Sequence, residues 1–299
     1  MNNGTILIVG GTGLIGSAVA QRLAADDFRV RILTRNPDQA RTTFGQRFEI
    51  VVGDVTDPQT LRTAVLGCSG VHLSLDGGAN PDVECEGAEN VVAACREHNV
   101  ERVTLLSGAS VREDTSWYPG TKAKLGAEAA VANSGIPYAI FRATFFMESL
   151  PRFVQGKRAS VIGKQPNPWH WVSAQDFAGM VSEAFTSVTD SGTFTVLGPQ
   201  ALTMQQALST YCATLDPSPK VSVLPLPIAS LMVRMQKSGP LATVLPFFRY
   251  LQVASEAGDP TEANAVFGAP TTTLDQWCAL QRASAIASAS VSSSHAHQA

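Results

Sequence analysis

Short apolar runs alternate with helical patterns along the first half of the chain. The runs are too short for helices and predict strands at 5–9, 30–34, 71–75, 103–107 and 138–141. Between them, apolar residues recur at helical spacing and predict helices at 17–25, 59–66, 82–98 and 121–134. A nearly continuous apolar strand such as 5–9 is typical of a parallel sheet covered on both faces. The alternation therefore predicts an α/β protein with a doubly wound parallel sheet, the Rossmann fold.

After Thr144 the alternation becomes irregular. Residues 166–176 suggest a loop, a short strand and the start of a helix, with Ser173 and Asp176 as a capping box. Thr203 and Gln206 repeat that signature ahead of another predicted helix. Residues 221–253 are apolar and interrupted by prolines, and most of this stretch is predicted to be helical.

These patterns predict one domain over residues 1–282. Residues 1–143 form its core, and residues 144–282 include a smaller C-terminal lobe on the substrate side. Residues 283–299 are rich in Ala and Ser and cannot pack a core, so we expect a disordered tail. His295 and His297 in that tail are expected to be solvated, because two histidines alone rarely make a metal site.

Composition narrows the partners and the compartment. The 299 residues carry a formal net charge of −3, which argues against nucleic acid as the main partner. The cysteines show neither C-x-x-C pairs nor zinc-ligand spacing with histidine, so no metal site is expected; they are Cys68, Cys85, Cys95, Cys212 and Cys278. No signal-like segment or membrane span of ~18 apolar residues is present, so we expect a cytoplasmic protein without a membrane partner.

The residues after the first predicted strand are rich in glycine. Gly10 allows a tight turn, Gly13 removes a side chain where the backbone approaches a pyrophosphate, and Gly16 allows the helix to lie close to the strand. The free N–H groups at the helix start then face the phosphates. The predicted cofactor contacts in this turn are Gly10, Thr12, Gly13, Leu14, Ile15 and Gly16.

The end of the second strand favours NADP(H), with NAD(H) as the weaker candidate. NAD-binding proteins place Asp or Glu there for the ribose hydroxyls, whereas this chain has Thr34 and Arg35. The Arg35 guanidinium can pair with a ribose 2′-phosphate, and Arg31 supports the same choice more weakly. The alternative is that Arg35 is only a solvated loop charge.

A further strand, the third in chain order, is expected between the predicted strands 30–34 and 71–75, and the segment "VVGDVTDP" (residues 51–58) follows it. It places Asp54 and Val55 where an adenine ring would lie, and Asp54 could accept a hydrogen bond from the adenine amino group. Asp54 could equally cap the next helix, although Asp57 before Pro58 is the better cap candidate.

Several longer segments resemble the NmrA-like group of atypical short-chain dehydrogenase/reductases. They are "GDVTDPQTLRTAVLGCSGV", "GAENVVAACREHNVERVTLLSG", "KLGAEAAVANSGIPYAIFRATFFMESL", "HWVSAQDFAGMVSEAF" and "FGAPTTTLDQW". With the glycine turn, the resemblance covers about residues 5–280. It implies an NAD(P)-binding Rossmann domain, and the group includes reductases of quinones, dyes and phenylpropanoids as well as cofactor-binding redox sensors.

The wider superfamily uses a Tyr-x-x-x-Lys dyad, and the chain contains Tyr118 and Lys122 at that spacing. The register of the related segments instead puts the lysine at Lys124, four residues before Glu128, and the tyrosine position at Gly120. The resemblance implies that Lys124 binds the nicotinamide ribose and relays protons. An ordinary i,i+4 ion pair with Glu128 is the alternative. Tyr118 precedes a proline, which favours an extended loop from which it could still swing in.

The remaining candidates follow strand ends or lie in the C-terminal lobe. Ser74 and Leu75, expected to end the fourth strand, are predicted to line the cofactor ribose. Ser107, ending the fifth, is counted among the predicted cofactor contacts and could also bond a substrate carbonyl; the alternative is a role in a cap or turn. The predicted substrate residues are Phe145, Phe146, Met147 and His170. For Phe145, Phe146 and Met147 the alternative is core packing; for His170 it is a structural role between Trp169 and Trp171.

Together these features predict an NADPH-dependent oxidoreductase that passes hydride to a quinone-like or other conjugated apolar acceptor. The alternative is a non-catalytic NADP(H)-binding redox sensor. The first requires a small-molecule substrate. The second requires a protein partner, for which the apolar region 221–253 is a candidate face, and a homodimer is left open.

Overall fold

The computed structural model describes residues 3–78, 80–187, 190–236 and 239–284. The chain divides into two compact units that interleave along the sequence. The first unit comprises Met1–Thr144, Ala174–Leu197 and Glu256–Pro270, and the second comprises Phe145–Ser173, Gly198–Ser255 and Thr271–Ala299. The chain first passes from the first unit to the second after Thr144, next to the predicted core boundary at residue 143. The two later segments that belong to the first unit, Ala174–Leu197 and Glu256–Pro270, were not predicted.

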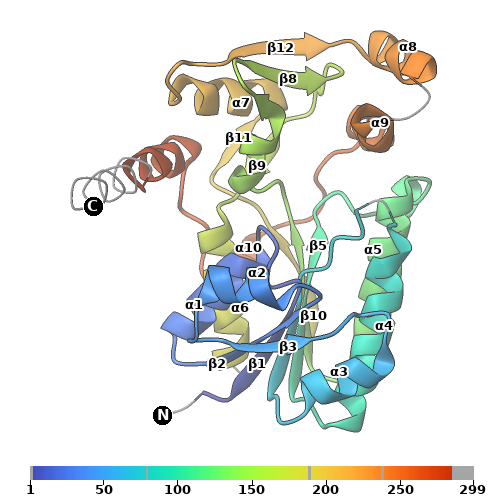
Figure 1. Cartoon of the computed structure of the whole chain (residues 1–299), viewed down its shortest axis with the longest axis vertical. Coiled ribbons are helices and arrows are strands. Elements are labelled where there is room, and N and C mark those ends of the chain that lie inside the picture. The colour runs from blue at the N-terminus through green and yellow to red at the C-terminus, as the bar shows by residue number, and fades with distance from the viewer. Residues whose placement is uncertain (1–2, 79, 188–189, 237–238, 285–299) are drawn as a thin grey trace. The chain divides into compact units, whose positions relative to one another are not determined.

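A parallel sheet of seven strands forms the centre of the first unit, in the order β10-β6-β5-β4-β1-β2-β3 (Figure 1). The strands are β1 (Thr5–Val9), β2 (Arg29–Thr34), β3 (Glu49–Val52), β4 (Gly70–Leu73), β5 (Arg102–Gly108), β6 (Tyr138–Ala143) and β10 (Gly192–Val196). The order reverses between β1 and β4, which is where ligands bind in open α/β sheets. The predicted doubly wound Rossmann fold is confirmed.

Helices cover both faces of this sheet. Figure 1 shows α3, α4 and α5 on one side and α1, α2 and α6 on the other. Their bounds are α1 (Gly16–Ala25), α2 (Pro37–Phe44), α3 (Pro58–Val65), α4 (Asp82–Glu97), α5 (Pro119–Ala132), α6 (Ala174–Thr186) and α10 (Thr261–Phe267), with a short 3-10 turn η1 (Glu113–Thr115). Leu7, Leu73, Val91 and Ile140 belong to the buried core of this unit. The apolar strand interiors thus exclude water on both faces.

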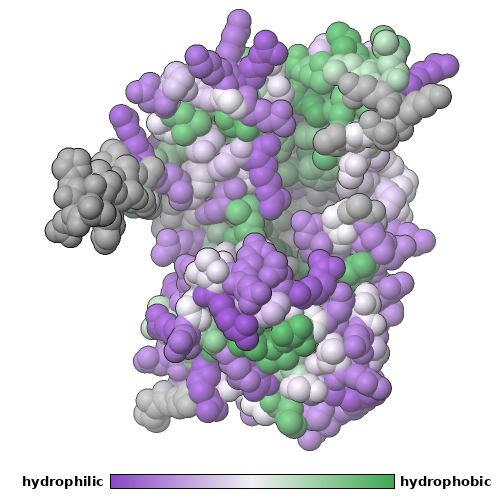
Figure 2. Space-filling view, viewed as in Figure 1, coloured by the Kyte–Doolittle hydropathy of each residue, from purple (hydrophilic) through white to green (hydrophobic). Residues whose placement is uncertain are grey.

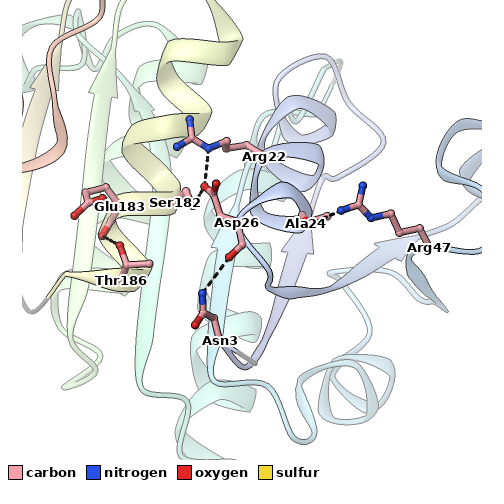
Figure 3. A network of polar contacts seen from close by, with 8 residues as sticks. All are labelled: Asn3, Arg22, Ala24, Asp26, Arg47, Ser182, Glu183 and Thr186. Atoms are coloured by element: carbon pink, nitrogen blue, oxygen red, sulfur yellow. Dashed lines mark hydrogen bonds and ion pairs between the residues drawn. The ribbon is translucent and has the colours of Figure 1, made fainter. Parts of the chain in front are cut away.

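The returning segment Ala174–Leu197 adds α6 and the edge strand β10 to the first unit. Helix α6 packs against α1, where Ser182 donates a 2.6 Å hydrogen bond to the Asp26 carboxylate and Arg22 makes a 2.6 Å ion pair with the same group (Figure 3). A Cβ on Gly179 would lie 2.9 Å from the Arg22 guanidinium, so the glycine leaves room for this arginine beside α6. This contact is between positions more than 150 residues apart, which explains why local patterns did not predict it.

The second unit combines short strands and helices. Its elements are η2 (Met147–Phe153), β7 (Val154–Gln155), β8 (Arg158–Ile162), β9 (Trp169–Trp171), β11 (Gln200–Leu202), α7 (Met204–Ala213), β12 (Lys220–Leu224), α8 (Leu226–Gln236), α9 (Pro240–Leu251) and a helix over residues 274–284. Thr203 and Gln206 form the predicted capping box of α7. The apolar region 221–253 contains the predicted helices, and α8 exposes Ile228, Leu231 and Met235, where Figure 2 shows hydrophobic surface. The predicted tail lies outside the described residues from 285 onward, and residues 283 and 284 still belong to the last helix.

Candidate functional site

The glycine turn between β1 and α1 has the geometry of a phosphate cradle. Gly10 has a positive φ of 84°, and a Cβ there would lie only 2.2 Å from the Ser74 backbone oxygen. A Cβ on Gly16 would lie 2.3 Å from the Gly10 carbonyl oxygen, so both positions exclude any larger residue. In the described segment 10–25, no acidic residue occupies the first turn of α1 and no side chain caps it. Its amide groups and positive helix end therefore suit a pyrophosphate.

Residues Thr12, Gly13 and Leu14 are exposed at the tip of this turn, whereas Ile15 is buried. The exposed backbone is accessible to a ligand, and the Ile15 side chain instead anchors the turn to the core. The turn residues therefore divide into those that can face a nucleotide and those that hold the loop in place.

Strand β2 ends beside β1, with Leu33 paired to Val9, so Thr34 and Arg35 follow next to the glycine turn. Thr34 is buried, and its hydroxyl oxygen accepts a 3.1 Å hydrogen bond from the Asn36 amide. The Arg35 side chain is 82% exposed, with its guanidinium 3.7 Å from the Asp54 carboxylate. The Arg35 guanidinium is thus accessible to solvent next to the glycine turn, and its contact with a ribose phosphate stays a prediction.

Arg31, proposed as a weaker contributor to the same choice, does not serve it. Its guanidinium forms a 2.9 Å ion pair with Glu49 and donates to the carbonyl oxygens of Ala64 and Leu66. These bonds tie it between β3 and the end of α3. Arg31 lies within β2, whereas Arg35 follows the end of that strand, so these contacts of Arg31 support the fold and not the predicted nucleotide site.

Asp54 does not cap α3, because Asp57 accepts the hydrogen bond from the Gln59 amide instead. The Asp54 carboxylate accepts from the Thr56 amide and hydroxyl, and the hydrogen bond from that amide is the main cause that lowers the pKa of Asp54. Val55 is buried, and its side chain would meet a Cβ on Gly87 in α4. The Val55 side chain therefore packs into the core, and the predicted adenine contacts of Asp54 and Val55 remain a proposal.

A pocket lies near the ends of β4 and β5 at the wall formed by α4 and α5. Its lining residues are Leu75, Glu84, Leu105, Leu106, Ser107, Lys124 and Ala127. Three predicted site residues, Leu75, Ser107 and Lys124, therefore come together. Strand β4 ends at Leu73, so Ser74 and Leu75 belong to the following loop and not to the strand as expected.

Lys124 forms its ion pair with Glu84 and not with Glu128. The Lys124 Nζ lies 2.6 Å from Glu84 Oε2, and the two side chains are 28% and 10% exposed. The i,i+4 alternative for Lys124 is therefore wrong. Glu84 was missed by the sequence analysis, although its spacing from the buried residues Gly87 and Ala88 places it on the inner face of α4.

Glu128 is instead the centre of a buried network. It accepts a 2.5 Å hydrogen bond from the Ser107 hydroxyl, and Arg142 donates to both of its carboxylate oxygens at 2.9 and 2.6 Å. These hydrogen bonds are the main cause that raises the pKa of Arg142. The Ser107 hydroxyl thus donates its hydrogen to Glu128 and not to a cap or turn, so toward any further partner its oxygen could act only as an acceptor.

Tyr118 is extended at the start of α5, as predicted from the proline that follows. A Cβ on Gly120 would lie 2.7 Å from a Tyr118 ring carbon and 3.4 Å from its hydroxyl oxygen. The phenol therefore covers the position that the family register assigns to the tyrosine. Gly120 makes room for that ring because it has no side chain.

The predicted substrate residues all lie in the second unit. Met147 is buried in that unit's core, so its predicted substrate contact is wrong and the alternative of core packing is correct. Phe145 is half-buried and packs its ring against Trp169 at 4.9 Å and Trp171 at 5.5 Å between centroids. Phe146 pairs with Val172 in an isolated bridge.

His170 lies in β9 between two buried tryptophans, and its side chain is half-buried. Its backbone carbonyl accepts a 3.2 Å hydrogen bond from the Gly198 amide. The strand alternation turns His170 away from the side on which Trp169 and Trp171 are buried. Substrate contacts by Phe145, Phe146 and His170 remain proposals.

Neither a metal site nor a membrane-spanning helix is present among the described residues. Over those ranges, no group of three or more His, Cys, Asp or Glu side chains could hold a metal ion. In the same part of the chain, no helix has both the length and the apolar composition needed to cross a bilayer.

Comparison with known sequences identifies relatives of the chain. A family model described as NAD(P)H-binding matches residues 10–188. The chain is 31% identical over 205 residues to a (4-alkanoyl-5-oxo-2,5-dihydrofuran-3-yl)methyl phosphate reductase of Streptomyces griseus, covering 67% of this chain and 70% of the relative. It is 28% identical over 203 residues to an NAD(P)H azoreductase of Xenophilus azovorans, covering 66% of this chain and 69% of the relative.

Solved structures confirm the fold. A triphenylmethane reductase of Citrobacter sp. in complex with NADP(H) superposes with a TM-score of 0.71 at 20% identity, covering 91% of this chain and 98% of that one. An NADPH-dependent quinone oxidoreductase of Escherichia coli gives a TM-score of 0.72 at 19% identity, covering 92% and 99%. At sequence identities this low, the similarity shows a shared backbone fold.

Proposed function

Because the chain belongs to the NAD(P)H-binding family, we propose that it is an NADPH-dependent oxidoreductase that passes hydride to a quinone-like or other conjugated apolar acceptor. The observation that carries this proposal is the glycine cradle at the switch point between β1 and β4, together with the small pocket near the ends of β4 and β5 that contains the Lys124–Glu84 ion pair. A dinucleotide site at this sheet edge, next to a largely apolar pocket with one ammonium–carboxylate pair, would suit reduction of a conjugated acceptor.

The cofactor fits the residues present. The cradle of Gly10 and Gly16 leaves no room for side chains at the pyrophosphate position, and the exposed guanidinium of Arg35 provides a cation for a 2′-phosphate. No carboxylate stands at the end of β2 to favour NAD(H), since that place is taken by Thr34. We therefore assign NADP(H) as the preferred cofactor.

The acceptor class is supported by the named activities of the relatives. An azoreductase, a triphenylmethane reductase and a quinone oxidoreductase are all named for conjugated acceptors. Reduction of such a molecule places negative charge on, or removes positive charge from, an extended π system. Where negative charge forms, an ammonium group can stabilise it or water can protonate it; where a positive charge is removed, the product is neutral. In neither case is a tyrosine in register required.

The bound nicotinamide would supply the hydride. Lys124 would donate to the ribose hydroxyls with the ammonium hydrogens that Glu84 does not accept. Its positive charge would stabilise negative charge that develops on the reduced acceptor. Leu75 and Leu105 would exclude water from the pocket, and Ser107 would accept a hydrogen bond there. Tyr118, whose phenol lies over Gly120, would be the candidate tyrosine proton donor.

A second candidate function is a redox sensor that binds NADP(H) without turnover. The observation that favours it is Gly120 at the register position of the tyrosine, which removes the usual proton donor. In that case the protein would report its cofactor state to a protein partner, and the pocket would serve only the cofactor.

The two functions are separated by NADPH oxidation measured across quinones, azo dyes, triphenylmethane dyes and conjugated carbonyls. The reductase predicts turnover with at least one class and a loss of at least about tenfold in Lys124→Met. Lys122→Met is the matched control, because Lys122 lies on the exposed face of the same helix. Tight NADPH binding with no turnover on any class would support the sensor instead.

A further inference from the structure

We propose that Glu84 is the positioning residue of this site and holds the Lys124 ammonium where it meets the cofactor ribose. The inference rests on the proposed function, since it assigns Lys124 to the cofactor. It adds a residue from α4 to a site otherwise built from strand ends and α5.

The ion pair exists because α4 and α5 approach closely. A Cβ on Gly126 would lie 2.4 Å from the Cys85 sulfur and 3.2 Å from the Cys85 Cβ, so the glycine favours a close approach of the two helices at this level. Glu84 adjoins Cys85 on α4, and Lys124 lies two residues before Gly126 on α5. The helix contact therefore brings the carboxylate and the ammonium together at the pocket wall.

Both oxygens of the Glu84 carboxylate have partners. Oε2 accepts a 2.6 Å hydrogen bond from Lys124 Nζ, and Oε1 accepts from the Gly77 amide at 3.3 Å. The second bond fixes the carboxylate to the loop after β4, the same loop that carries Ser74 and Leu75. Glu84 thus links the loop predicted to line the ribose with the lysine predicted to bind it.

Burial makes this contact strong. With the Glu84 side chain only 10% exposed, water competes little for the carboxylate, and each charge compensates the other. An ammonium has three hydrogens, of which Glu84 takes one. The other two are then directed by the fixed ion pair and not by free rotation of a long side chain.

The test is a double-mutant cycle read as NADPH affinity, which requires no acceptor. Glu84→Gln keeps the shape and can still accept from the Gly77 amide, but it removes the charge opposite Lys124. We expect NADPH to bind about tenfold more weakly to this variant, from the usual strength of a charge-assisted hydrogen bond. In Lys124→Met the loss is expected to be at least as large, and adding Glu84→Gln to that variant is expected to cost nothing more.

Glu97→Gln is the matched control. Glu97 ends the same helix and pairs with Arg62 at 2.7 Å, but both side chains are about half exposed and neither lines the pocket. This variant is expected to bind NADPH like the unmodified chain. It separates a role at the pocket from the general effect of losing an ion pair on α4.

Unchanged affinity in Glu84→Gln, or losses that multiply in the double variant, would overturn the proposal. If Glu84→Gln does not fold, Glu84→Asp takes its place, since it keeps the charge but shortens the reach to Lys124 and is expected to show the same coupling. With an acceptor present, the positioning role also predicts a fall in kcat and an unchanged KM for the acceptor. Absence of turnover in the unmodified chain would refute the proposed reductase. The NADPH affinities of the single and double variants would still test the role of Glu84, because they require no acceptor.

Discussion

Replacing Arg35 by alanine should abolish the preference for NADPH over NADH. A charge-assisted hydrogen bond contributes roughly 1.5–3 kcal/mol. The Arg35 side chain is 82% exposed and lies 3.7 Å from the Asp54 carboxylate, so solvent screening and competition favour the lower end of that range. We therefore expect about tenfold weaker NADPH binding in Arg35→Ala and unchanged NADH binding.

The assay is titration of each variant with both cofactors at fixed ionic strength, because an exposed ion pair is screened by salt. Arg41→Ala is the control, since Arg41 is exposed nearby on α2 and pairs with Asp38 across 3.4 Å. That variant should bind both cofactors like the unmodified chain. An unchanged NADPH-to-NADH affinity ratio in Arg35→Ala would refute the assignment of this residue to the 2′-phosphate.

Two further substitutions test the cradle and the core. Gly10→Ala places a Cβ 2.2 Å from the Ser74 backbone oxygen at φ +84°, so NADPH titration should show lower affinity and urea unfolding lower stability. The control is Gly45→Ala, which has φ +63° but open space around it and should leave NADPH affinity unchanged. Equal NADPH affinity in the two variants would contradict the cradle. Burial lowers the pKa of His72 to about 3, whereas the unfolded chain takes up that proton below about pH 6.5, so stability should fall as pH falls through this window, by about 2 kcal/mol at pH 5. His72→Leu should reduce the pH dependence of urea unfolding by about one proton, and an unaltered slope would show that another group is responsible.

The parts of the fold that could be predicted from the sequence are those that depend on local pattern. Strand β1 was predicted with its observed bounds, because a continuous apolar run after a polar start has few alternatives. The glycine turn was recognised because strand, glycines and helix follow one another within 20 residues. Helix α2 was missed, although Asn36 and Pro37 form a normal helix start, because its eight residues carry little apolar periodicity.

Contacts between distant segments were beyond the sequence analysis. Strand β10 and helix α6 join the first unit from a segment after residue 173, and no local pattern states which unit a later segment joins. The partner of Lys124 was missed for the same reason: Glu84 lies 40 positions away and meets it only through the packing of α4 against α5. Met147 was assigned to the substrate because burial in a second core cannot be distinguished from a pocket lining by residue type alone.

The most direct test of the account is a single turnover with NADPH deuterated at the carbon that donates hydride. The acceptor should be a triphenylmethane dye or another conjugated molecule in which the new bond is a stable C–H bond. Direct transfer predicts that the deuterium appears on the acceptor carbon and that consumption of NADPH slows with the heavier isotope. Deuterium retained in the cofactor, or exchanged with water before it reaches the acceptor, would contradict the proposed reductase.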